Sequence, residues 1–129
     1  MSQKNLGIIG GGQLGSMLSQ AAKKLNIRTT IYSDDIDAPA QNFCDEFICG
    51  EYHNKKKVLE FVSKVDVITY EFENIPYETL NEMNKLKSVL PKPSVNRLIQ
   101  HRIAEKDFIN KLNIRTTRYV SIEKKTDIE

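Results

Sequence analysis

The sequence predicts an α/β protein whose core is a doubly wound, mostly parallel β-sheet, and three observations support this fold class. Short apolar and β-branched runs alternate with stretches of helical periodicity along the 129 residues. The first apolar run ends in glycines that lead directly into a helical stretch. Hydrophobic residues make up 40% and charged residues 28% of the chain, which is typical of a folded domain of ordinary size.

Strands are expected where apolar, β-branched or aromatic residues cluster. In chain order these clusters cover residues 6–9, 27–32, 47–49, 65–70, 89–90 and 115–122. Helical stretches lie between most of them, so right-handed crossovers and parallel pairing are expected. Ligands of such sheets bind beyond the carboxyl ends of the strands, and we therefore expect the loops at residues 10–15, 33–37 and 71–76 to be neighbours.

Helices are expected over residues 13–25, 55–63, 77–85, from about residue 95, and over 102–112. In the first helix, apolar or small residues recur with helical spacing and predict one buried stripe: Leu14, Met17, Leu18, Ala21, Ala22 and Leu25. Pro76 suits the first turn of the third helix, and Ser94 can cap the fourth.

The charge balance and the cysteine count exclude several classes of function. The 19 basic and 17 acidic residues leave a net charge of +2, so neither a nucleic acid nor an anionic membrane is expected as the main partner. No apolar run approaches the roughly 18 residues of a membrane span, and the first residues lack a secretory pattern, so a cytoplasmic protein is expected. Cys44 and Cys49 lack further ligands at metal spacing and are interpreted as small apolar residues near a strand. His53 and His101 are isolated, so we predict surface positions for both and no metal site in this chain.

Residues 10–15 read Gly-Gly-Gly-Gln-Leu-Gly and satisfy the G-x-G-x-x-G pattern between a strand and a helix. Gly10 permits the tight turn, Gly12 lets a ligand approach the backbone, and Gly15 lets the helix and strand pack closely. The free N–H groups at the start of the helix then face the ligand. We interpret the loop as facing a ligand, with a structural tight turn as the alternative.

One reading of this loop is a small NAD-binding Rossmann module. Asp34 follows the motif by roughly 20 residues, where a carboxylate can hold the two ribose hydroxyls. The alternative reading takes Asp34, Asp35 and Asp37 as a solvated turn. A dehydrogenase is disfavoured, because no histidine or lysine is placed as an acid for hydride transfer and no substrate domain follows.

A second group of polar residues, Glu71 and Glu73, follows the predicted central strand at 65–70. Strand alternation would place both carboxylates on one face, with Tyr70 and Phe72 on the other. Ionised carboxylates only accept hydrogen bonds, so they suit a ligand rich in amine or hydroxyl donors. An anion-stabilising glycine loop beside such a pair fits a phosphosugar bearing an amine, and solvated loop charges are the alternative.

Four segments in this order also carry a resemblance to a known family. They are GIIGGGQLGSML, TTIYSDDIDAPAQ, ITYEFENIP and NRLIQHRIAEKDFINKLNIRTTRY, and together they span essentially the whole chain. The sequence resembles the N-terminal, Rossmann-like pre-ATP-grasp domain of the 5-(carboxyamino)imidazole ribonucleotide synthases, in the ATP-grasp superfamily. A G-G-G-Q-L-G loop joined to E-F-E-x-x-P is not a dehydrogenase pattern.

The resemblance implies an ATP-dependent carbon–nitrogen ligase of purine biosynthesis. Such an enzyme joins bicarbonate to the amine of 5-aminoimidazole ribonucleotide and releases ADP and phosphate. The family's ATP and Mg²⁺ are held mainly by an ATP-grasp domain, and its members are often homodimers. The implied partners are therefore 5-aminoimidazole ribonucleotide, bicarbonate and ATP.

The resemblance also implies roles for particular residues. Gln13 and Leu14 match a pair that contacts the ribonucleotide, Glu71 matches a loop carboxylate near the substrate amine, and Glu73 is assigned a supporting role. Arg102 matches an arginine that reaches ATP from this domain. Ser16 departs from the pattern, because an arginine is common at that position.

The domain organisation follows from the same resemblance. Residues 1–114 are expected to form the substrate-binding pre-ATP-grasp domain, and residues 115–129 the start of the connection to an ATP-grasp domain. A chain of this length is expected to fold but not to catalyse alone, and no catalytic residue is assigned within it. A non-catalytic subunit that binds a partner chain remains a further alternative.

Overall fold

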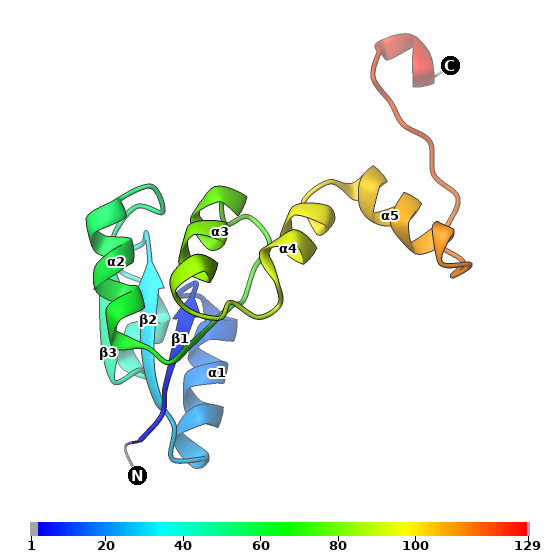
Figure 1. Cartoon of the computed structure of the whole chain (residues 1–129). Helices are drawn as coiled ribbons and strands as arrows, with labels where there is room; N and C mark the ends of the chain where they lie inside the picture. Colours follow the sequence, from blue (N-terminus) through cyan, green and yellow to red (C-terminus); the bar gives the residue numbers. More distant parts are fainter. Residues whose placement is uncertain (1–2, 129) are drawn as a thin grey trace.

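The computed structural model describes residues 3–128 and contains a four-stranded sheet in the order β3-β2-β1-β4 (Figure 1). The strands are β1 (Asn5–Ile9), β2 (Arg28–Ser33), β3 (Glu46–Cys49) and β4 (Val67–Tyr70), and every pair is parallel. The predicted α/β class with a parallel sheet is therefore confirmed. The strand at 65–70 was expected to be central, and this is met only in part: β1 pairs with full strands on both sides, whereas β4 pairs with β1 on one side and has only the single bridge from Ile68 to Val89 on the other.

The register of the sheet brings the carboxyl ends of the strands to one edge. Ile9 of β1 lies opposite Tyr32 of β2 and Tyr70 of β4, and Ser33 lies opposite Cys49 of β3. The segments that follow all four strands therefore begin at the same edge, where parallel sheets bind ligands.

Helices cover both faces of the sheet. The α1 helix (Gln13–Lys24) and the short 3₁₀ helix η1 (Pro39–Asn42) pack together over one face, around a small core of Ile8, Ile31 and Ala40. The α2 (Lys55–Lys64) and α3 (Tyr77–Leu86) helices cover the other face in Figure 1 and enclose the larger core. The members of this core include Ile9, Tyr32, Phe61, Ile68, Leu80 and Met83.

The predicted buried stripe of α1 is largely wrong. Leu14, Met17 and Leu25 are 54%, 57% and 73% exposed, and of the predicted stripe only Ala22 is buried. The face that packs on the sheet consists of small residues: Gly15, Ser16, Ser19 and Ala22. Small side chains are needed there because the glycine loop joins α1 to β1 by a tight turn, and the helix therefore lies close to the strand.

After α3, the chain packs one more helix against the domain and then leads away from the sheet (Figure 1). This part of the chain contains α4 (Pro93–Ile99), α5 (Arg102–Lys111) and the 3₁₀ turn η2 (Lys125–Ile128). Ser94 does not cap α4, because the helix begins with Pro93 and its N-cap residue is Lys92.

Two of the predicted strands are not formed as expected. Residues 115–122 have strand-like composition but form no strand, because no neighbouring strand offers them backbone hydrogen bonds. The expected strand at 89–90 is reduced to a single parallel bridge between Val89 and Ile68. None of the helices within residues 3–128 is long and apolar enough to cross a membrane.

Candidate functional site

A cavity of about 270 Å³ opens at the carboxyl edge of the sheet. Its walls come from the segments that follow β1, β2, β3 and β4, so the expected neighbourhood of the three loops is confirmed. The residues that line it are Gly11, Gly12, Ser33, Asp34, Asp35, Ala38, Pro39, Tyr52, Glu71 and Phe72. The volume lies just below the range of about 300–1,000 Å³ that is usual for ligand pockets.

The glycine loop forms the floor of this cavity. Gly10 has a φ of +109°, a conformation that favours glycine, and its N–H donates to the carbonyl of Tyr32 at 2.9 Å. Gly11 accepts a hydrogen bond from the N–H of Ala40 at 3.0 Å, which ties the loop to η1. The loop is thus held from both neighbouring segments, and the start of α1 faces the cavity.

The Glu71 carboxylate lies directly over the glycine loop. The Gly12 N–H donates to Glu71 Oε1 at 3.3 Å, and a Cβ added to Gly10 would lie 2.5 Å from Glu71 Cγ. The backbone N–H of Glu71 donates to the carbonyl of Ile9 at 3.2 Å, so its position depends on the end of β1. The anion that faces the start of α1 is therefore a side chain of the protein itself.

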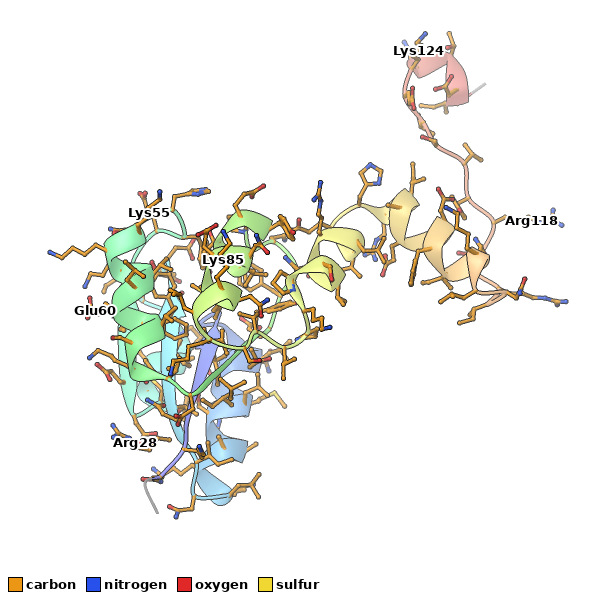
Figure 2. The ribbon with its side chains drawn as sticks, viewed as in Figure 1. Arg28, Lys55, Glu60, Lys85, Arg118 and Lys124 are labelled. Carbon is orange, nitrogen blue, oxygen red and sulfur yellow. The ribbon has the colours of Figure 1, made fainter. Side chains whose placement is uncertain are left out.

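The charge of the cavity wall is negative. Asp34, Asp35 and Glu71 line it, and among the described residues that line it there is no lysine, arginine or histidine. Arg28 lies near the amino end of β2 and Arg118 lies on the extended segment after α5, both away from this edge (Figure 2). Such a surface favours hydrogen-bond donors of a ligand and disfavours its phosphate.

Aromatic side chains form another part of the wall. The Tyr52 ring lies 6.3 Å from that of Phe72 and 6.0 Å from that of Tyr32, and both pairs are tilted. Burial and the nearby Asp34 carboxylate raise the pKa of Tyr52, so its hydroxyl stays neutral and can donate. The carbonyl of Tyr52 accepts a hydrogen bond from Thr79 Oγ1 at 2.9 Å, which anchors this residue to α3.

The fully buried Tyr32 leads to a prediction about alkaline pH. Its hydroxyl donates to the carbonyl of Glu51 at 2.8 Å, and burial with the nearby Cys49 and Asp34 raises the pKa of Tyr32 to about 12. This pKa is raised above the value near 10 that tyrosine has in the unfolded chain. The contribution of the neutral Tyr32 hydroxyl to the free energy of unfolding is therefore fully present below pH 10 and is lost as the pH rises toward 12. We expect the free energy of unfolding to fall by about 2 kcal/mol more in the wild type than in Tyr32→Phe over this window, measured by urea denaturation. Equal losses in the two proteins would contradict the prediction.

The structure brings some of the predicted site residues together and not others. Gly12 and Glu71 line the cavity, whereas Gln13 and Leu14 are exposed on the first turn of α1 and do not line it. Glu73 is also exposed and outside the cavity wall. The expected strand alternation of the two glutamates is wrong, because β4 ends at Tyr70 and residue 71 begins a bend.

Two further positions were singled out from the sequence. Arg102 is exposed at the start of α5, where its Nη1 donates to Glu105 Oε2 at 2.9 Å. Ser16 is buried in the face of α1 that packs on the sheet, and its hydroxyl donates to the carbonyl of Gly12 at 3.0 Å. A serine here supports the loop from within the helix and does not reach the cavity.

The sequence interpretation missed Tyr52 as a part of the site. Ser33 and Phe72 also line the cavity and lie in the loops expected at this edge, but they were not named as site residues. Tyr52 lies three residues after the end of β3. It could have been predicted as a site residue, because ligands bind beyond the carboxyl ends of parallel strands. Within the described residues no group of three or more His, Cys, Asp or Glu could hold a metal ion. Cys44 and Cys49 are free and half-buried, and His53 and His101 are exposed as predicted.

A parallel sheet, a glycine loop at the start of the first helix and a cavity beyond the strand ends define a Rossmann-like domain. In this class, the glycine loop and the segments after neighbouring strands form the ligand site. Residues 3–100 match the family described as the ribonucleotide synthetase preATP-grasp domain. The chain belongs to this family.

Relatives and solved structures agree with this assignment. An N5-carboxyaminoimidazole ribonucleotide synthase from Brucella melitensis is 39% identical over 111 residues, covering 86% of this chain and 31% of the relative. The Staphylococcus aureus synthetase complexed with ADP superposes with a TM-score of 0.89 at 33% identity, covering 97% of this chain and 34% of that one. The Aspergillus clavatus enzyme, in complex with ADP and 5-aminoimidazole ribonucleotide, gives a TM-score of 0.80 at 27% identity over 90% of this chain and 31% of that one.

The chain spans about a third of the length of the curated synthases that it matches, and it corresponds to their N-terminal part. These homologues are ATP-dependent ligases of purine biosynthesis. A small NAD-binding module is therefore not the favoured interpretation of the glycine loop.

Proposed function

We propose that this chain is the substrate-binding domain of a ligase that uses ATP and bicarbonate to carboxylate the amine of 5-aminoimidazole ribonucleotide. The observation that carries the proposal is the Glu71 carboxylate, held over the glycine loop in a chain of this family. The complex of the Aspergillus clavatus relative with 5-aminoimidazole ribonucleotide supports the choice of substrate.

The residues of this chain bind and orient the donor-rich part of the substrate. Glu71 accepts hydrogen bonds from the amine or from ribose hydroxyls, and Asp34, which also lines the cavity, offers a second acceptor. Tyr52 and Phe72 cover apolar parts of the ligand and exclude water from one side of the cavity. Holding the amine in one orientation raises its effective concentration toward an activated carboxyl donor.

The remaining requirements of the reaction are assigned to the rest of the ligase. ATP with Mg²⁺ supplies the phosphorylation that activates bicarbonate. Arg102 is proposed as the contact of this domain with ATP, and residues 115–129 as the connection toward the ATP-grasp domain. The exposed position of Arg102 and the absence of a strand over residues 115–122 are compatible with these roles. The complete enzyme is proposed to be a homodimer.

Titration calorimetry of the purified chain tests the proposal. We expect saturable binding of 5-aminoimidazole ribonucleotide, no binding of NAD⁺ at the same concentrations, and no ATP-dependent carboxylation by residues 1–129 alone. Binding of NAD⁺ that weakens in the Asp34→Ala variant would support the dinucleotide module. Detectable carboxylation by this chain would overturn the division of labour between the two domains.

A further inference from the structure

The loop that carries Glu71, residues 71–76 and named here the Glu71 loop, is held at its two ends by different parts of the molecule. At its start, the N–H of Glu71 donates to the carbonyl of Ile9, at the end of the sheet. Toward its end, the carbonyls of Glu73 and Ile75 accept hydrogen bonds from side chains of the α4 region. The loop therefore depends on α4 as well as on the sheet.

Gln100, the residue that follows α4, makes two of these contacts. Its Nε2 donates to the carbonyl of Glu73 at 2.6 Å and to the carbonyl of Ile75 at 2.7 Å. One amide nitrogen carries two hydrogens, so both bonds can be made at the same time. Gln100 thus bridges two carbonyls of the Glu71 loop that are two residues apart.

Asn96 makes the third contact from inside the protein. It is 0% exposed, and its Nδ2 donates to the carbonyl of Ile75 at 3.1 Å. Its Oδ1 is buried without a hydrogen-bond partner among the described residues, which is unfavourable for folding. An apolar residue at position 96 would avoid the cost of burying an unpaired oxygen. What the asparagine adds is the hydrogen bond from its Nδ2 to the Glu71 loop.

We propose that Gln100 and Asn96 are positioning residues that keep the Glu71 loop seated, so that the Glu71 carboxylate stays over the glycine loop. The positioning role itself does not depend on the proposed function. Only its consequence rests on that function, namely that substrate binding depends on Gln100 because Gln100 positions Glu71. Neither residue lines the cavity, so neither acts by touching the ligand.

The test uses the Gly12 N–H as a reporter that needs no ligand, because it donates to Glu71 Oε1. Amide hydrogen exchange of residues 1–129 is measured by NMR in the wild type, Gln100→Leu and Gln100→Lys. Gln100→Leu removes the donors with little change in size, whereas Gln100→Lys keeps a donor. Gln100 is exposed, so both variants are expected to fold. Gln41→Leu is the matched control, because Gln41 is exposed and its side chain has no hydrogen-bond partner among the described residues.

We expect Gly12 exchange to accelerate about threefold to tenfold in Gln100→Leu, to return toward the wild-type rate in Gln100→Lys, and to be unchanged in Gln41→Leu. Glu71→Ala marks the rate that applies when no side-chain acceptor faces the Gly12 N–H. An unchanged Gly12 rate in Gln100→Leu overturns the proposal. Acceleration spread evenly over the amides of the sheet also overturns it, because it indicates a merely structural role.

A second arm measures the affinity for 5-aminoimidazole ribonucleotide. Gln100→Leu is expected to weaken binding about threefold to tenfold in the wild type and much less when Glu71→Gln is already present, since coupled residues are not additive. Equal losses in both backgrounds would overturn the dependence on Glu71. If the wild type does not bind this ligand, the proposed function fails, and the exchange measurement still decides the positioning role.

Discussion

Replacing Glu71 with glutamine is expected to weaken binding of 5-aminoimidazole ribonucleotide by about tenfold to a hundredfold. The carboxylate is the acceptor that lies over the glycine loop, and hydrogen bonds to a charged acceptor contribute roughly 1.5–3 kcal/mol. Glutamine keeps the shape of the side chain but replaces one acceptor oxygen with a donor nitrogen, which cannot accept from an amine. Titration calorimetry gives the change in dissociation constant directly.

The control for this variant is Glu78→Gln, the same substitution at an exposed position in the first turn of α3. It changes the net charge of the protein by the same amount, so a general electrostatic effect would appear in both proteins. In the proposed full-length ligase, Glu71→Gln is expected to impair the use of the aminoimidazole substrate. Unchanged affinity and kinetics would contradict this prediction and would support the alternative that Glu71 is a solvated loop charge.

The second large effect is expected at Gly15, where alanine should destabilise the fold by about 1–3 kcal/mol. A Cβ at this position would lie 2.5 Å from the carbonyl oxygen of Gly10, and that neighbour is backbone. Relief of the contact requires α1 to move away from the end of β1. The better helix propensity of alanine opposes the loss by up to about 1 kcal/mol and does not remove the contact. Urea denaturation followed by circular dichroism measures the free energy of unfolding.

Ser19→Ala is the matched control for Gly15→Ala. Ser19 lies on the same buried face of the same helix, and its hydroxyl has no hydrogen-bond partner among the described residues. Its removal is expected to leave stability unchanged or slightly increased, because an unsatisfied buried hydroxyl is unfavourable. If Gly15→Ala were as stable as Ser19→Ala, the close approach of α1 to the glycine loop would not limit stability.

Much of the fold could be predicted because its signals are local. The first strand, the glycine loop and the start of α1 follow from an apolar run, a G-x-G-x-x-G pattern and helical spacing, all within about twenty residues of sequence. The helices at 55–63, 77–85 and 102–112 were found within a residue or two of α2, α3 and α5. Glu71 could be selected because it directly follows a predicted strand.

The failures have a common cause, which is that the partner of a segment is not visible in its own sequence. Periodicity placed Leu14 and Met17 inside, yet the face of α1 that meets the sheet is the one with small residues. Residues 115–122 have strand propensity, but a strand needs a neighbour for its backbone groups. Tyr52 carries no motif, and it enters the site because β3 is short and ends at the same edge as β1.

The α/β class, the glycine loop and the family to which this chain belongs could all be read from the amino-acid sequence, since each depends on residue types at short, ordered spacing. Three other features became visible only in the folded structure: Glu71 faces the glycine loop, Glu73 does not line the cavity, and Gln100 donates to the carbonyls of Glu73 and Ile75. These are contacts between residues distant in sequence. Their geometry is set by how closely the helices and strands can pack, which no local pattern encodes.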